Sequence, residues 1–132
     1  MRCVVRAFMP AVVILLAGCS LFGSHDVRVA RITSILAPDT VFVDSTFQAT
    51  VTALLGPDSG YVLDHFEITN STDAKLTVRV WSRDTASVRP VTSGAMYFDV
   101  QAAITPTEPG KYLVIGYQPD GRDTVKTITV LP

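Results

Sequence analysis

The sequence predicts an all-β fold, an antiparallel β-sandwich of about seven short strands. Three observations lead to this prediction. Several segments alternate apolar and polar residues with a period of two, the pattern of a strand that buries one face. Turn-forming motifs rich in Pro, Gly, Asn and Asp separate these segments. Beyond residue 26 no segment has a convincing helical period, so strands account for the whole predicted domain.

Before the predicted domain, the first segment has the features of a secretory signal peptide. Arg2 and Arg6 make the start basic, and an apolar run follows from Ala7 to Ala17. This run is well short of the ~20 residues that a membrane-spanning helix needs. A basic start, a short apolar run and small residues at its end are typical of a secretory signal. We therefore expect residues 1–18 to be removed.

The end of this signal carries the most specific motif in the sequence. Leu16-Ala17-Gly18-Cys19 resembles the lipobox of bacterial lipoproteins. The resemblance implies that the Cys19 thiol receives a diacylglycerol group and that a peptidase cuts between Gly18 and Cys19. Two or more acyl chains anchor a protein stably in a membrane. Ser20 resembles the sorting signal for the outer membrane of Gram-negative bacteria, so the expected location is the periplasmic face of that membrane.

The remaining chain is expected to be a short tether, residues 19–26, followed by one domain, residues 27–132. Cys3 leaves with the signal, so Cys19 is the only remaining cysteine and no intramolecular disulfide can form. The sequence has eleven basic and twelve acidic side chains. Loss of Arg2 and Arg6 with the signal leaves nine basic side chains, so the formal net charge of the remaining chain is −3. Without a basic block, nucleic acid is not an expected partner.

Alternation and turn motifs then define the strands one by one. The clearest runs begin at Phe47, where every second residue up to Leu55 is apolar, and at Leu76 and Phe98. In chain order the predicted strands are 27–36, 47–55, 61–69, 75–81, 98–104, 111–117 and 124–131. The predicted turns between them are Ala37-Pro38-Asp39, Gly56-Pro57-Asp58, Asn70-Ser71-Thr72-Asp73, Glu108-Pro109-Gly110 and Pro119-Asp120-Gly121.

The sixth of these strands suggests a family. Glu108-Pro109-Gly110-Lys111-Tyr112-Leu113-Val114 resembles the approach to strand F of immunoglobulin-like domains. The resemblance implies an immunoglobulin-like sandwich in which Gly110 permits a sharp turn and the Tyr112 hydroxyl bonds to the backbone of the preceding connection. Val114 stands where antibody domains have a cysteine, and their core tryptophan is missing. Phe66 is the expected aromatic substitute for that tryptophan.

The sequence predicts neither an enzyme nor a metal or cofactor site. In Asp64-His65-Phe66-Glu67, alternation directs Asp64 away from His65 and Glu67, which leaves too few ligands for structural zinc. Nucleophile and phosphate-binding motifs are absent. Two minority alternatives stay open. Asp58 or Asp120 could ligate calcium, and four segments match an O-glycosylation pattern: Asp39-Thr40-Val41, Asp44-Ser45-Thr46, Asp84-Thr85-Ala86 and Asp123-Thr124-Val125.

A binding surface is the functional prediction that remains. If Tyr112 and Val114 point inward, then outward-facing residues form an apolar group. This group is Leu113, Ile115, Tyr117 and, on the next strand, Val125, with Trp81 as a further outward candidate beside Arg79 and Arg83. We expect a binding or structural module whose partner is a protein or a second copy of the chain. A carbohydrate-binding module that uses Trp81 and, less favoured, a small periplasmic enzyme are the alternatives.

Overall fold

The computed structural model of this chain describes residues 26–71, 74–85 and 91–132. All regular secondary structure within these ranges is β-strand. No helix with the length and apolar character to cross a membrane occurs among these residues. The strands are β1 (Val27–Val29), β2 (Arg31–Leu36), β3 (Thr40–Phe42), β4 (Phe47–Asp58), β5 (Tyr61–Ser71), β6 (Lys75–Asp84), β7 (Ser93–Ile104), β8 (Gly110–Gly116) and β9 (Thr124–Leu131).

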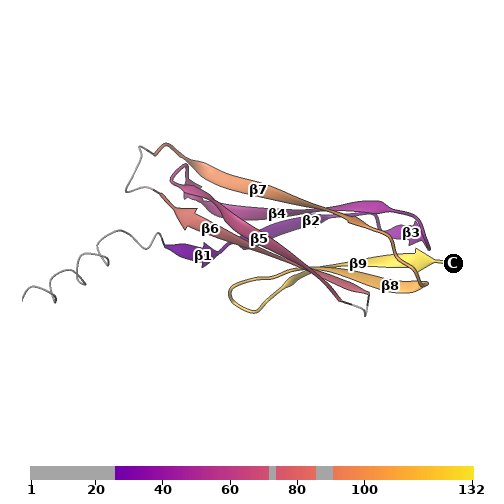
Figure 1. Cartoon of the computed structure of the whole chain (residues 1–132). Coiled ribbons are helices and arrows are strands. Elements are labelled where there is room, and N and C mark those ends of the chain that lie inside the picture. The colour runs from indigo at the N-terminus through magenta and orange to yellow at the C-terminus, as the bar shows by residue number, and fades with distance from the viewer. Residues whose placement is uncertain (1–25, 72–73, 86–90) are drawn as a thin grey trace, which may run out of the picture.

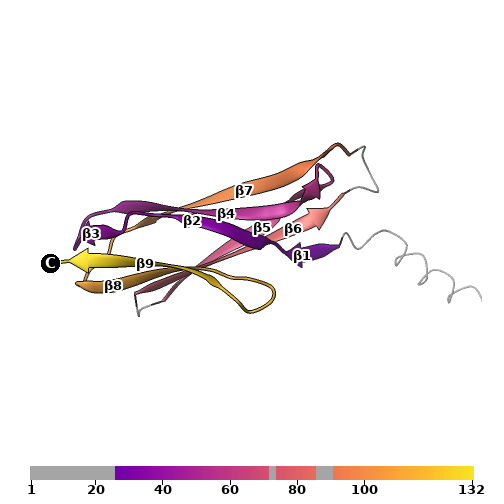
Figure 2. The same cartoon turned by 180° about the vertical axis from the view of Figure 1, so that it is seen from behind.

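The strands form two sheets that pack face to face (Figures 1 and 2). Sheet A has the order β1-β6-β8-β9-β3, with β5 also paired to β6, and sheet B has the order β2-β4-β7. Because β5 follows one edge of β6 over its whole length, β1 and β8 share the other edge. β1 lies beside the end of β6 and β8 beside its beginning. Sheet A is therefore the wider layer.

The all-β prediction is confirmed, but the purely antiparallel prediction is wrong. β3 pairs parallel with β9, and β6 pairs parallel with β8. Alternation fixes which residues of a strand are buried, but it is the same for a parallel and an antiparallel neighbour. The strand number also differs, because the segment predicted as 27–36 divides at Ala30, whose amide donates to the Val80 carbonyl at 2.8 Å. This division lets the chain pass from sheet A to sheet B, and β3 is a further short strand.

The core consists of the inward residues of both sheets. Most of these residues are valine, alanine and isoleucine, which fit between two pleated surfaces. Its aromatic members, Phe47 and Tyr112, meet edge to face with ring centroids 6.3 Å apart. The buried apolar residues are Ala30, Ile32, Val41, Phe47, Ala49, Val51, Ala53, Leu55, Leu76, Val78, Val80, Val100, Ala102, Ile104, Tyr112, Val114, Ile128 and Val130.

Two details expected from the immunoglobulin resemblance differ in the structure. Phe66 does not replace a core tryptophan, because it lies on the edge strand β5 and is 42% exposed. The Tyr112 hydroxyl is expected to bond to the backbone of the preceding connection. In the structure it donates a hydrogen bond to the side-chain oxygen of Asn70 on β5, at 3.3 Å. By contrast, Gly110 has φ = 134°, a conformation that a glycine adopts without strain, as a sharp turn at this position requires.

A buried glutamine ties β2 of sheet B to sheet A. The Gln118 side-chain oxygen accepts a hydrogen bond from the Ile32 amide at 3.0 Å, and its Nε2 donates to the Ile32 carbonyl at 2.6 Å. Nε2 also donates to Thr124 Oγ1 at 2.9 Å. The β2–β4 ladder is irregular between Ile32 and Ser34, so an amide side chain supplies the backbone pairing that β2 lacks there.

Candidate interaction surface

The outward residues of β8 and β9 lie where the alternation predicts. Tyr112 and Val114 are buried, and the intervening Leu113 and Ile115 are half-buried. Ile115 lies opposite Val125 of β9, which is 52% exposed. Directly opposed residues on paired strands project from the same face. These apolar side chains therefore belong to the outer face of sheet A.

β6 continues this face on the other side of β8. Its Arg79 guanidinium carbon lies over the Tyr117 ring, 4.3 Å from the centroid, which is the geometry of a cation–π contact. The Tyr117 amide donates to the Val78 carbonyl at 2.9 Å and extends the parallel β6–β8 pairing by one residue. Glu67 of β5 lies opposite Arg79. A charged and aromatic row thus crosses three strands.

A second row contains Trp81, with its neighbour His65 on β5. The two rings stack with centroids 4.3 Å apart and an angle of 10° between their planes. The predicted separation of Asp64 from His65 is wrong, because their side chains meet: His65 Nδ1 is 2.5 Å from an Asp64 oxygen. The ladder is irregular between Leu63 and His65, so the period-two rule fails at Asp64. Trp81 is half-buried, on the outward side of β6.

The outer face of sheet A therefore brings together all five residues predicted as a partner surface. We call Trp81, Leu113, Ile115, Tyr117 and Val125 the outer-face cluster.

The basic side chains of β6 and β8 that share this face are Lys75, Arg79, Arg83 and Lys111, and the acidic ones of β5 are Asp64 and Glu67. The face has an excess of positive charge, whereas the chain as a whole has a formal net charge of −1.

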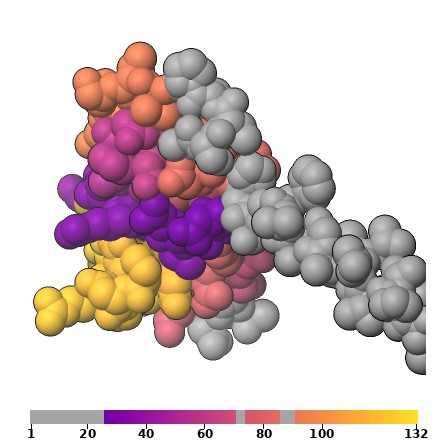
Figure 3. All heavy atoms as spheres, turned by 90° about the vertical axis from the view of Figure 1, so that its left-hand side faces the viewer, coloured from indigo at the N-terminus to yellow at the C-terminus, as the bar shows by residue number. Residues whose placement is uncertain are grey.

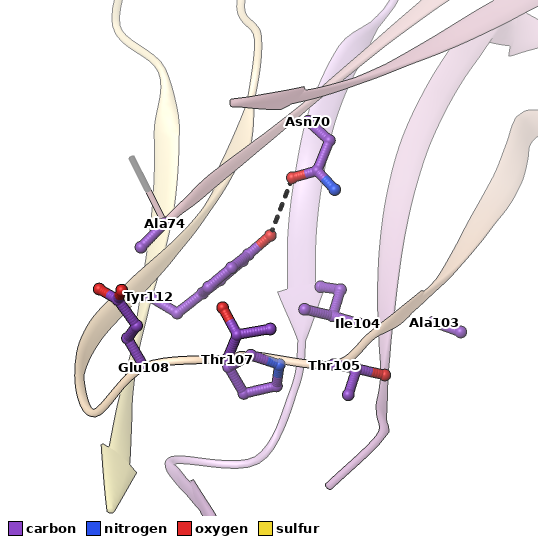
Figure 4. Close-up of a pocket in the computed structure, with 9 residues that line it drawn as sticks. Asn70, Ala74, Ala103, Ile104, Thr105, Thr107, Glu108 and Tyr112 are labelled. Carbon is purple, nitrogen blue, oxygen red and sulfur yellow. Dashed lines mark hydrogen bonds between the residues drawn. The ribbon is translucent and has the colours of Figure 1, made fainter. Parts of the chain in front are cut away.

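A polar recess of about 360 Å³ lies at another place, where β5 and β7 end (Figure 4). It is lined by Asn70, Ala74, Ala103, Ile104, Thr105, Pro106, Thr107, Glu108 and Tyr112. The Tyr112 hydroxyl donates to Asn70, and burial raises its pKa above the ordinary value. The recess offers hydrogen bonds to a ligand. No sequence motif predicts it, because its lining residues are far apart in the chain.

The aspartates considered as calcium ligands have a turn role. Asp58 accepts from the Gly60 amide at 2.8 Å, and Asp120 accepts from the Arg122 amide at 2.9 Å. Carboxylates that accept from the amide two residues later stabilise turns. Among residues 26–71, 74–85 and 91–132 there is no group of three acidic, histidine or cysteine side chains that could hold a metal ion.

The four matches to an O-glycosylation pattern differ in accessibility. Thr40 and Ser45 are exposed and Thr124 is half-buried. Thr85 is 8% exposed, and its hydroxyl donates to the Gly60 carbonyl at 2.8 Å. A buried, hydrogen-bonded hydroxyl is not open to modification, so the structure does not favour glycosylation of Thr85.

The predicted lipidation residue, Cys19, and the cleavage position at Gly18 lie outside the described residues. Comparison of the chain with models of protein families, with curated proteins and with solved structures found no match.

Proposed function

We propose that this protein is a lipid-anchored, extracytoplasmic binding module, held through Cys19 on the periplasmic face of an outer membrane, and that the outer-face cluster binds a partner protein. One observation carries the binding part of the proposal: apolar, aromatic and basic side chains from β5, β6, β8 and β9 share one outward sheet face. Aromatic residues and arginine are enriched at protein interfaces, whereas lysine and glutamate are depleted.

The charge on this face favours a different protein over a second copy of the chain. Lys75, Arg79, Arg83 and Lys111 outnumber the two acidic side chains there. Two copies that met through this face would bring like charges together, at an energetic cost. The partner of this proposal therefore presents acidic and apolar side chains.

The surroundings of Trp81 do not favour the carbohydrate alternative. A sugar stacks on the flat face of an indole ring. His65 occupies one face of this indole at a centroid distance of 4.3 Å. On the other side, Val29 of β1 lies opposite Trp81 in the sheet. One face of the ring is therefore covered by His65 and is closed to a stacking sugar.

An immunoglobulin-like fold remains part of the proposal. In its support, β2, β4 and β7 share one sheet and β5, β8 and β9 share the other, as strands A, B, E and strands C, F, G do in that fold. The departure is β6, which stands between β5 and β8 in sheet A. In the constant-type arrangement the corresponding strand D belongs to the other sheet. We propose a variant of the fold with this strand relocated.

The binding proposal is tested with Ile115→Lys. Ile115 is half-buried at the middle of the face, so a lysine can extend into solvent without disturbing the core. Crosslinking in native membranes should recover the partner with the wild-type chain and at least tenfold less with the variant. Gln48→Lys, on the outer face of sheet B, is the matched control and should retain the partner. Equal recovery with a folded Ile115→Lys chain would remove the interface.

The anchor is tested separately with Cys19→Ser. Both lipidation and cleavage depend on the thiol, so the variant should lose labelling by a fatty-acid probe and persist as the uncleaved precursor. Labelling that survives in the serine variant would refute the anchor and leave the outer-face proposal standing.

A further inference from the structure

β7 is an unprotected edge strand. It closes sheet B on one side and pairs only with β4 among the described strands. Both ribbon views show β7 along one margin of the molecule (Figures 1 and 2), and its first residues form the rim in the end-on view (Figure 3). In an antiparallel ladder every second residue directs its N–H and C=O away from the partner. The free edge of β7 thus presents unpaired backbone groups that can pair with another strand.

The other described edges carry features that prevent such pairing. β1 and β3 have three residues each. β2 has six residues, an irregular ladder and Arg31. β5 has an irregular ladder and the charges of Asp64 and Glu67. The β7 ladder also has two register shifts, opposite residues 54–58 of β4, but it is regular from Tyr97 to Ile104. β7 runs for twelve residues without proline, lysine or arginine, and Asp99 is its one charged residue. Long, uncharged edges are the ones that recruit further strands.

The inner side of β5 is left partly uncovered beside this edge. Phe66 and Ile68 lie opposite the buried Val80 and Val78, so they face the space between the sheets. They are nevertheless 42% and 39% exposed. The Phe66 ring lies beside the ring of Phe98 on β7, at a centroid distance of 5.9 Å. Because sheet B ends at β7, no described strand covers these side chains. One more strand beside β7 would cover Phe66 and Ile68.

We propose that the free edge of β7 accepts an extended segment of a partner protein as a fourth strand of sheet B. The inward side chains of that segment are apolar, since they cover Phe66 and Ile68. Its outward side chains are basic, since the one charge on β7 is that of Asp99, which lies on the outer face of sheet B beside Thr52. The polar recess at the end of β7 would receive one side chain at the end of the added strand.

Charge selects this occupant over a second copy of the chain. Asp99 is the one charged residue of β7, which has no lysine or arginine. An antiparallel dimer formed edge to edge through β7 would place the Asp99 carboxylates of both copies on the same outward face. A segment that alternates apolar and basic residues meets the opposite charge and also matches the period-two geometry of strand addition.

The test uses synthetic peptides and the full chain purified in detergent. The probe is a fluorescein-labelled peptide as long as β7 that alternates valine and lysine. One comparison peptide alternates valine and glutamate, and another has the valines and lysines of the probe in two blocks. Fluorescence anisotropy should give at least tenfold tighter binding of the probe than of either comparison peptide, with weaker binding at high salt. Hydrogen exchange should slow in β7 on binding.

Two substitutions locate the site. Asp99→Lys should weaken probe binding at least tenfold, and Phe66→Ser should do so even if Asp99→Lys disturbs folding. Gln48→Lys, which also introduces a lysine on the outer face of sheet B, and Ile115→Lys, on the outer face of sheet A, should leave binding unchanged. The last comparison separates this site from the outer-face cluster.

Three results would overturn the proposal. The first is an affinity for the probe no greater than for the block peptide. The second is protection from exchange on sheet A in place of β7. The third is concentration-dependent dimerisation with protection of β7 in the absence of peptide, which would assign the edge to a second copy.

Discussion

Replacing Gln118 by leucine tests whether this one buried side chain holds β2 in the sandwich. In the structure its amide pairs with both the N–H and the C=O of Ile32, and Ile32 is 2% exposed. Leucine has a similar volume and cannot pair with either group. A buried backbone group without a partner costs about 1–3 kcal/mol. The apolar gain from leucine offsets part of this loss, so we expect the free energy of unfolding to fall by about 2–4 kcal/mol.

Urea denaturation followed by circular dichroism measures this loss. Gln48→Leu is the matched control, because Gln48 is exposed on β4 and its replacement should change stability by less than about 0.5 kcal/mol. A loss in Gln118→Leu no larger than in the control would show that the Ile32 backbone finds other partners. The m-value should stay constant, because a change in m would indicate that β2 has detached in the folded state.

Gln118→Glu separates the two hydrogen bonds. An ionised carboxylate could still accept from the Ile32 amide but would lie against the Ile32 carbonyl oxygen, so burial and that oxygen raise the pKa of the introduced glutamate in the folded state. The folded state then binds the proton more tightly than the unfolded one. Stability should be highest below the unfolded pKa of about 4.3 and fall as the pH rises through the folded pKa. Stability that does not change with pH in this range would contradict the orientation of the amide.

Two further predictions concern pairs of side chains, one that involves the buried Tyr112 and one at the surface. Tyr112→Phe removes a long hydrogen bond to the exposed Asn70 side chain, so it should lower stability by about 0.5–1 kcal/mol in urea denaturation; a loss above about 2 kcal/mol would mean that the hydroxyl has a buried partner. Lys126, which pairs with Asp39, lowers the pKa of that carboxyl through a hydrogen bond and its charge. The pair therefore contributes above the unfolded pKa and is lost as the pH falls through the folded pKa. Lys126→Met should return the Asp39 pKa towards 3.8 in an NMR titration, and high salt should have the same effect in the wild type.

The positions of the strands could be predicted because alternation is a local property. The segment predicted as 124–131 is the strand Thr124–Leu131 of the structure, and the segment predicted as 47–55 lies within β4. Which strands pair is not local. Leu76 would alternate in the same way beside β5, β8 or β7, so the sequence pattern carried no information about the parallel pair with β8.

The candidate surface could be predicted for the same reason and with the same limit. Outward positions on β8 follow from the buried Tyr112, whereas the stacking of His65 on Trp81 depends on the irregular ladder after Leu63. A bulge changes the face of the sheet on which a side chain lies, and no residue type in this segment predicts the bulge. Gln118 was likewise missed, since a glutamine after a strand normally indicates a solvent-exposed position.

The placement of β6 links the two surfaces proposed for this protein. Only residues 72–74 connect β5 to β6, so the two strands form a hairpin in one sheet, whereas residues 85–92 leave enough chain to cross to β7 in the other sheet. With β6 in sheet A, Arg79 and Trp81 extend the face that β8 begins. The same placement removes β6 as a neighbour for β7 and leaves sheet B, with three strands, narrower than sheet A, with six. Had β6 paired with β7, Phe66 would be covered and Trp81 would lie on the opposite layer. The short connection after β5 thus decides both which side chains meet on the broad face and which backbone edge stays open.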